Sequence, residues 1–176
     1  MQVQGKLIIL LMLGTAVAMA GFAWTFQYMR GREVLRLWGA DAAQLIRVDA
    51  SGIELLVLSP AAETAAPNAA ANETLDVAGQ SLHVDQRVDI SKARGLIHAR
   101  QALIEDASFD WTLARGDCTP DWRYALEFRA GDRRAVIAID MHCSRVRLLP
   151  GDREASIAPI AEGLEKFIVE QLAPPS

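Results

Sequence analysis

Side chains able to bind a metal ion occur at Cys118, Asp140, His142 and Cys143. Thiolate, imidazole and carboxylate groups are common zinc ligands, but the spacing of these residues matches no standard zinc pattern. Cys118 and Cys143 are the only cysteines. A bond between them would close a loop of about 25 residues and stabilise the fold by roughly 3 kcal/mol. Three alternatives therefore stay open for the two cysteines: a disulfide, two free structural thiols, or a metal site.

The remaining histidines, His83 and His98, are weaker candidates for a base or a ligand, because an isolated histidine is more often a surface or core residue. The sequence contains no glycine-rich phosphate loop, nucleophile elbow, His-Glu-x-x-His or paired Cys-x-x-Cys motif. We therefore expect no cofactor and favour a protein that is not an enzyme. The alternative is an anchored hydrolytic or metal-dependent enzyme that uses the neighbourhood of Asp140, His142 and Cys143.

The segment 122–149 predicts an antiparallel meander whose register can be argued. Gly131-Asp132 is suited to a two-residue hairpin turn. This turn pairs Phe128 with Ala135, Leu126 with Ile137, Tyr124 with Ile139 and Trp122 with Met141, and so places the large apolar residues on one face. A second turn at His142-Cys143 would add Val146 and Leu148 to the same face. A slip of one residue would destroy this pattern, so we expect this register.

Arginines gather on the opposite face of the same meander. The predicted register places Glu127 and Asp140 among five of them: Arg123, Arg129, Arg134, Arg145 and Arg147. One interpretation is a solvated surface on which cross-strand ion pairs contribute little. The other is a binding face for an anionic partner such as a lipid headgroup, a phosphate-bearing ligand or an acidic protein.

Composition restricts the class of protein that must position these residues. The chain has 176 residues, 51% of them apolar, and 18 basic against 22 acidic residues give a net charge of -4. That much apolar content excludes a disordered chain. The absence of a basic excess argues against binding to nucleic acid on electrostatic grounds. The length fits one domain of ordinary size.

An uncharged apolar run from Leu7 to Phe26 predicts a membrane anchor. As a helix, a run of this length covers about 30 Å, which is the thickness of a bilayer core. Trp24 and Tyr28, followed by Arg30, are typical of a membrane interface. We therefore expect a single-pass membrane protein that contacts the bilayer through residues 7–26.

Two features of this anchor stay open. The sequence Ala18-Met19-Ala20 before Gly21 also fits a signal-peptide cleavage site, but the apolar run continues beyond it. Arginines after the run favour a cytoplasmic domain by the positive-inside rule, whereas a short amino-terminal tail with one Lys6 is typical of anchors that export their C-terminal domain. We favour an uncleaved anchor and an extracytoplasmic domain.

Hydrophobic spacing behind the anchor predicts the remaining elements. A first helix is expected over 33–48, with a break near Gly39. A second should follow the capping residues Asp89 and Ser91, with an apolar face from Ala93 to Ala107. A third is expected over 157–172. Strands are expected over 53–58, 75–77 and 82–88. The Ala-rich segment 60–73 between them should be a mobile loop. Trp38 fits a core position or a contact at the membrane equally well.

The predicted protein is thus an α+β chain with an N-terminal transmembrane helix. Residues 1–32 form the anchor with its flanks, and 33–176 form one soluble domain. Its antiparallel sheet of four to six strands is packed by two or three amphipathic helices. We interpret it as a structural or interaction module with a protein partner in the membrane, such as an accessory subunit or assembly factor of a membrane complex.

Overall fold

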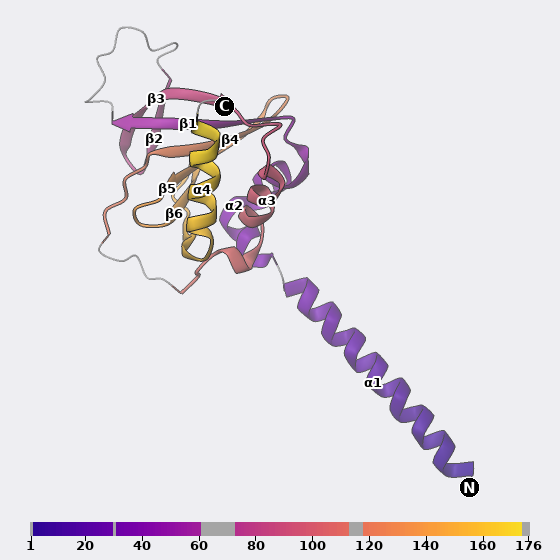
Figure 1. The fold of residues 1–176 in the computed structure, drawn as a ribbon. Coiled ribbons are helices and arrows are strands. Elements are labelled where there is room, and N and C mark those ends of the chain that lie inside the picture. Colours follow the sequence, from indigo (N-terminus) through magenta and orange to yellow (C-terminus); the bar gives the residue numbers. More distant parts are fainter. Residues whose placement is uncertain (1, 30, 61–72, 113–117, 174–176) are drawn as a thin grey trace.

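The computed structural model describes residues 2–29, 31–60, 73–112 and 118–173. Helix α1 spans Gln2–Met29, and Figure 1 shows it extending away from the rest of the chain as a straight rod. Over the residues whose side chains are described, which in α1 are 8–24, no helix is both long and apolar enough to cross a membrane. The predicted loop 60–73 falls almost wholly outside the described residues.

Helix α2 spans Arg32–Gln44 and passes into a short π-helix, η1, over Leu45–Asp49. The break predicted near Gly39 is confirmed, because Gly39 has φ 77° inside α2. A glycine is needed there since side chains with a Cβ rarely adopt positive φ. The break turns the second half of the segment so that Ala43, Leu45 and Ile46 reach the core together with Val34.

A carboxylate from a distant segment caps the start of α2. Asp106 begins the 3-10 turn η2, Asp106–Ser108, and it accepts hydrogen bonds from the backbone N–H of Gly31 at 2.6 Å and of Val34 at 2.9 Å. The first N–H groups of a helix have no partner within the helix, so this acceptor satisfies two of them. The contact fastens the junction between α1 and α2 to the rest of the domain.

We expect the substitution Asp106→Ala to lower the free energy of unfolding by about 1 to 2 kcal/mol, as the loss of a helix cap does. Urea denaturation of the full chain in detergent measures this change. Glu165→Ala, which removes an exposed acid from helix α4 (Ala161–Leu172), is the matched control and should change stability by less than about 0.5 kcal/mol. Equal effects of the two substitutions would contradict the capping role.

Within the described residues, the sheet has seven antiparallel strands in the order β2-β3-β1-β4-β5-β6-β7. Their bounds are β1 Gly52–Pro60, β2 Thr74–Val77, β3 Gln80–Asp89, β4 Tyr124–Ala130, β5 Arg133–Asp140, β6 Arg145–Leu149 and β7 Glu154–Ser156. The expected number of four to six strands was therefore too small. Strand β7 is the missing one, because three residues with a single buried alanine carry no alternating pattern.

The meander has the predicted register. Phe128 lies opposite Ala135, Leu126 opposite Ile137 and Tyr124 opposite Ile139. On the next strand Val146 pairs with Ile139, and Leu148 pairs with Ile137. Gly131, at φ 58°, turns the first hairpin as expected, and Ser144, at φ 51°, supplies the left-handed position of the second.

Both faces of the sheet are covered, which the sequence patterns did not predict. Helices α2, α3 (Leu96–Leu103) and α4 (Ala161–Leu172) pack on one face over Leu55, Phe128 and Ile137, as Figure 1 shows for α4. The other face carries a second apolar cluster that includes Leu56, Leu82 and Ala138. The sheet curls, and β2 comes into contact with β6 across this second cluster. Sheet twist and curl thus bury part of a face that both interpretations of the arginines had left accessible to solvent.

The predicted position of Trp122 was wrong. Its side chain is buried in the second cluster with Ala125 and Val136, on the face opposite to Leu126 and Phe128. Strand β4 begins only at Tyr124, so the strict alternation of side chains does not extend back to Trp122.

The last two helices differ in how closely they match the prediction. Residues 158–160 form the 3-10 turn η3, Ala158–Ile160, and α4 comes next with Leu164, Phe167 and Ile168 buried as expected. Helix α3 is shorter than its apolar pattern suggested. Gly95 precedes it at φ 87° and Ile104 follows it at φ -116°, so non-helical backbone limits the helix at both ends.

Gly95 and Gly163 form a matched pair for mutation. A Cβ on Gly95 would sit 3.6 Å from the Phe167 ring at a positive φ, whereas Gly163 has open space around it within α4. We expect Gly95→Ala to destabilise the fold by about 1 to 2 kcal/mol through backbone strain. Gly163→Ala should stabilise it by about 0.5 to 1 kcal/mol through helix propensity. Thermal unfolding of both variants checks these opposite signs, and equal signs would contradict the argument.

Candidate functional site

A network of charged side chains lies at the edge of the second apolar cluster, on the face that carries the predicted arginines. Glu127 on β4 is its centre and is 0% exposed. Arg129 donates to Glu127 at 2.6 Å, Arg87 on β3 donates to it at 3.0 Å, and Arg134 on β5 forms an ion pair with it. The predicted register explains this grouping in part, since Arg129 lies directly opposite Arg134.

Two further carboxylates balance the three arginines. Glu54 on β1 accepts from Arg87 at 2.6 Å, and Glu73, just before β2, accepts from Arg134 at 2.6 Å. Three acids thus face three guanidinium groups, and the network is neutral as a whole. Glu54 and Glu73 were not among the predicted site residues. The pairing of β1 with β4 places Glu54 opposite Glu127, and the arrangement of the whole sheet brings Glu73 to Arg87 and Arg134. Both groupings depend on how distant strands pair, so local spacing contains no signal for them.

The burial of Glu127 and its three arginine neighbours determine the pKa of its carboxyl. Burial raises the pKa of the Glu127 carboxyl, but hydrogen bonds from Arg129 and Arg87 and the charge of Arg134 outweigh that effect, so its pKa lies below the usual value of a glutamate. The carboxylate therefore stays charged inside the fold, where it is held by hydrogen bonds rather than by water.

All five arginines of the predicted anionic face have a carboxylate within ion-pair distance. Besides Arg129 and Arg134, Arg123 lies 2.9 Å from Asp121, Arg145 lies 3.8 Å from Glu154 on β7, and Arg147 pairs with the same Glu154. An external anion would have to compete with these acids. The binding of an anionic ligand or lipid at this face stays a prediction.

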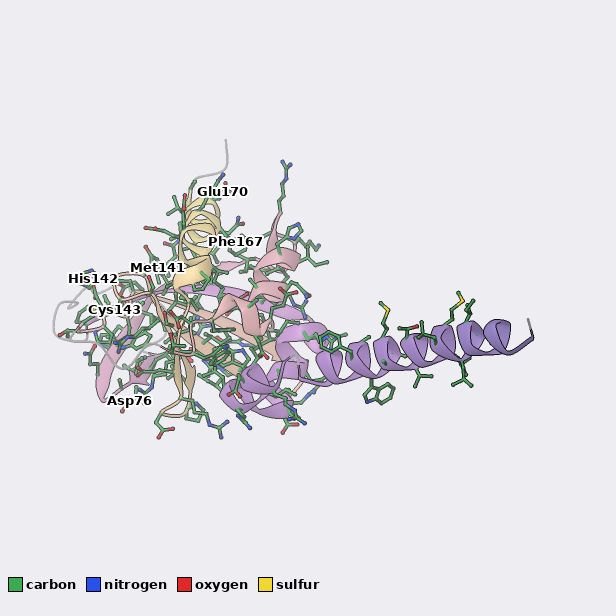
Figure 2. The ribbon with its side chains drawn as sticks, turned by 90° about the horizontal axis from the view of Figure 1, so that it is seen from below. Asp76, Met141, His142, Cys143, Phe167 and Glu170 are labelled. Carbon is green, nitrogen blue, oxygen red and sulfur yellow. A yellow bond between two sulfur atoms is a disulfide. The ribbon has the colours of Figure 1, made fainter. Side chains whose placement is uncertain are left out.

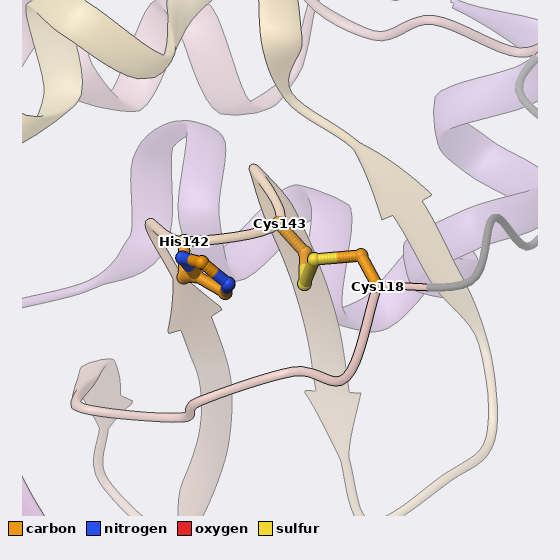
Figure 3. A group of neighbouring side chains, drawn as sticks. All are labelled: Cys118, His142 and Cys143. Atoms are coloured by element: carbon orange, nitrogen blue, oxygen red, sulfur yellow. A yellow bond between two sulfur atoms is a disulfide. The ribbon is translucent and has the colours of Figure 1, made fainter.

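The second candidate site is the turn between β5 and β6. Cys118 and Cys143 form a disulfide with their Cα atoms 5.9 Å apart, and Figure 3 shows the His142 imidazole beside it. Donor atoms of Cys118, His142 and Cys143 all lie within 4.8 Å of one another. Figure 2 places His142 and Cys143 at the end of the domain that is remote from α1.

Asp140, the fourth predicted ligand, has a different position. Its buried carboxylate accepts hydrogen bonds from the backbone N–H of His142 at 2.9 Å and of Cys143 at 3.1 Å. Burial raises the pKa of Asp140, while the N–H groups of Cys143, Asp121 and His142 oppose that shift. Asp140 thus fixes the conformation of the turn that carries the other donors, and it does not belong to the donor group itself.

The other candidates do not come together. His98 is exposed on α3, and His83 is half-buried on β3, where the nearby Asp85 accepts a hydrogen bond from the Ser59 hydroxyl at 2.8 Å. Trp38 is a core residue: it is 2% exposed, donates to the Leu103 carbonyl at 2.6 Å and packs edge-on against Phe109. Of the two interpretations of Trp38, the core position therefore holds.

A groove that the sequence patterns did not predict runs between α3 and α4. Its volume is about 880 Å³, and its walls combine apolar residues such as Leu164 and Phe167 with the charged Arg94, Lys166 and Glu170. Figure 2 shows Phe167 and Glu170 along α4. Small residues on the facing helix, Ala99 and Ala102, leave this space open.

Comparison with known proteins does not identify a function for these sites. No protein-family model, curated protein or solved structure matches the chain.

Proposed function

We propose that this protein is a membrane-anchored interaction module. Residues 7–26 would hold it in the bilayer as a single uncleaved span, and the domain 33–176 would contact a protein partner as an accessory subunit or assembly factor of a membrane complex. The observation that carries this proposal is the exposure of the apolar side chains of α1.

The exposed apolar side chains are concentrated in α1. Ile9, Leu13, Val17 and Phe22 are between 66% and 74% exposed. The six consecutive residues 8–13 are all large, apolar and exposed. Consecutive helical residues point in different directions, so the exposed apolar surface covers the whole circumference of the helix. Figure 2 shows side chains projecting from α1 in several directions. In water so much exposed apolar surface is costly, and a lipid environment around the helix removes that cost.

The domain itself supports an interaction role better than a catalytic one. Among the described residues, the buried acids Glu127 and Asp140 are both held by hydrogen bonds. Cys143 is part of a disulfide and so has no thiolate to act as a nucleophile. A disulfide also favours an oxidising compartment, which supports an extracytoplasmic domain.

Anchoring is tested by placing arginines in α1. In the double variant Leu13→Arg/Val17→Arg, each arginine near the centre of a span costs about 2.5 to 3.5 kcal/mol on insertion scales. We expect the wild-type chain to stay in the membrane pellet after alkaline washing and the variant to move to the soluble fraction. Leu35→Arg, which changes an exposed leucine of α2, should stay in the pellet. Release of the wild type would refute the anchor.

The side of the membrane is tested with the two cysteines. A membrane-impermeant thiol reagent should label Cys118 and Cys143 in intact cells only after reduction, if the domain is extracytoplasmic and disulfide-bonded. Labelling that needs permeabilisation would place the domain in the cytoplasm.

The protein partner is tested by the size of the particle that mild detergent extracts from the membrane. If a partner is bound, the extracted particle should be larger than the 19.2 kDa chain with its detergent micelle.

A further inference from the structure

The three donors beside the β5–β6 turn suit a metal ion once the disulfide is open. Cys118, His142 and Cys143 bring two sulfur atoms and one imidazole within 4.8 Å of one another. Figure 3 shows the imidazole next to the sulfur atoms rather than turned away from them. Two thiolates and an imidazole form a soft donor set that prefers zinc over magnesium or calcium.

We propose that the reduced protein binds zinc through Cys118, His142 and Cys143, and that the disulfide is the closed state of this site. The proposal is independent of the membrane anchor and of any partner. Three protein ligands leave the fourth position of a tetrahedral ion to water or to an external ligand.

The surrounding structure prepares the donors in two ways. Buried Asp140 accepts from the backbone N–H groups of His142 and Cys143, so two of the three donors lie on a turn with a fixed conformation. Cys118 is brought to that turn from the chain segment that leads into β4, with its Cα 5.9 Å from the Cα of Cys143. Thiolates on one tetrahedral zinc lie about 3.8 Å apart when each Zn–S bond is about 2.3 Å. The two sulfur atoms therefore have to separate, and the imidazole, which lies within 4.8 Å of them, has to adjust its position.

The exchange between the two states is balanced in electrons and protons. A dithiol reductant supplies two electrons and two protons to the S–S bond, which yields two protein thiols and the oxidised, disulfide form of the reductant. Zinc then binds the two sulfur atoms as thiolates and releases the two thiol protons to the solvent. Oxidation of the thiols by a disulfide reverses the sequence and expels the ion.

The test uses the full chain in detergent micelles, without oxygen, with cobalt(II) as the spectroscopic substitute for zinc. A phosphine first reduces the disulfide and is then removed. We expect cobalt to produce thiolate-to-metal charge-transfer absorption and the intense d–d bands of a tetrahedral site, one ion per chain, and zinc to abolish both. The oxidised protein should show neither. Equal spectra of the two forms, or no absorption in the reduced form, would overturn the proposal.

Single substitutions identify the ligands. His142→Ala should weaken cobalt binding by at least about tenfold, because loss of a ligand costs at least as much as loss of its outer support. His98→Ala, which removes an exposed histidine from α3, should leave the affinity unchanged. Equal affinities in the two variants would exclude His142 as a ligand and overturn the site as stated.

Circular dichroism shows whether the reduced protein is still folded. If reduction alone unfolds the domain, the proposal requires that zinc restores the native spectrum in the wild type and fails to do so in His142→Ala. A reduced wild-type chain that stays unfolded with zinc present would overturn the proposal.

Discussion

Glu127→Gln is expected to lower the free energy of unfolding by about 2 to 3 kcal/mol. The substitution keeps the shape of the side chain but leaves Arg87, Arg129 and Arg134 without their common carboxylate. Removing one partner of a fully buried ion pair costs about 3 to 5 kcal/mol. The expected loss is smaller here because the three arginine side chains are 31% to 45% exposed and water can solvate them in part.

The matched control is Glu54→Gln. Glu54 belongs to the same network and contacts Arg87 and Arg129, but its side chain is 28% exposed and it is not the centre. Its replacement should cost less than about 1 kcal/mol. Chemical denaturation of both variants measures the difference. If the two losses of unfolding free energy are equal, the burial of Glu127 does not explain its contribution to stability.

The same residue gives the stability of the protein a pH dependence. The pKa of Glu127 is lowered in the folded state, so the folded chain binds its proton less readily than the unfolded chain does. The contribution of Glu127 is therefore complete above the ordinary pKa of a glutamate and is lost as the pH falls through the lowered folded pKa. The stability difference between wild type and Glu127→Gln should be constant near neutral pH and shrink in acid.

The regular part of the fold could be predicted because its patterns are local. The alternation of Leu126 and Phe128 with Ile137 and Ile139 determines the register of β4 and β5, and Gly131 determines their turn. The break at Gly39 is also a local property of one residue. By contrast β7 is too short to carry a period, and α3 ends where Ile104 leaves helical φ although the apolar spacing continues.

The site residues could be predicted only where they lie on one hairpin or one turn. Arg129 and Arg134 are paired by the hairpin, but Arg87, Glu54 and Glu73 join Glu127 through the order of strands and the curl of the sheet. Curl depends on how the whole sheet packs, and no short segment encodes it. The groove between α3 and α4 is missed for the same reason, since it exists only after both helices lie on the sheet.

The disulfide is expected to contribute roughly 3 kcal/mol to stability. Cys118 and Cys143 are separated by 25 residues, and closing a loop of that length restricts the unfolded chain. The double variant Cys118→Ser/Cys143→Ser should lose about this amount in urea denaturation under non-reducing conditions. Tryptophan fluorescence follows the unfolding, since Trp38 and Trp122 are both buried in the folded domain.

Reductant separates the effect of the bond from that of the substitutions. Reducing the wild type should lower its stability towards that of the double variant, whereas reductant should not change the double variant. If the reduced wild type binds zinc, a concentration of about one hundred times the dissociation constant should return about 2.7 kcal/mol to it and nothing to the double variant. Stability would then depend on the cysteines in both redox states, through a covalent bond in one and a shared metal ion in the other. A reduced wild type as stable as the oxidised one without zinc would refute the expected contribution of the bond.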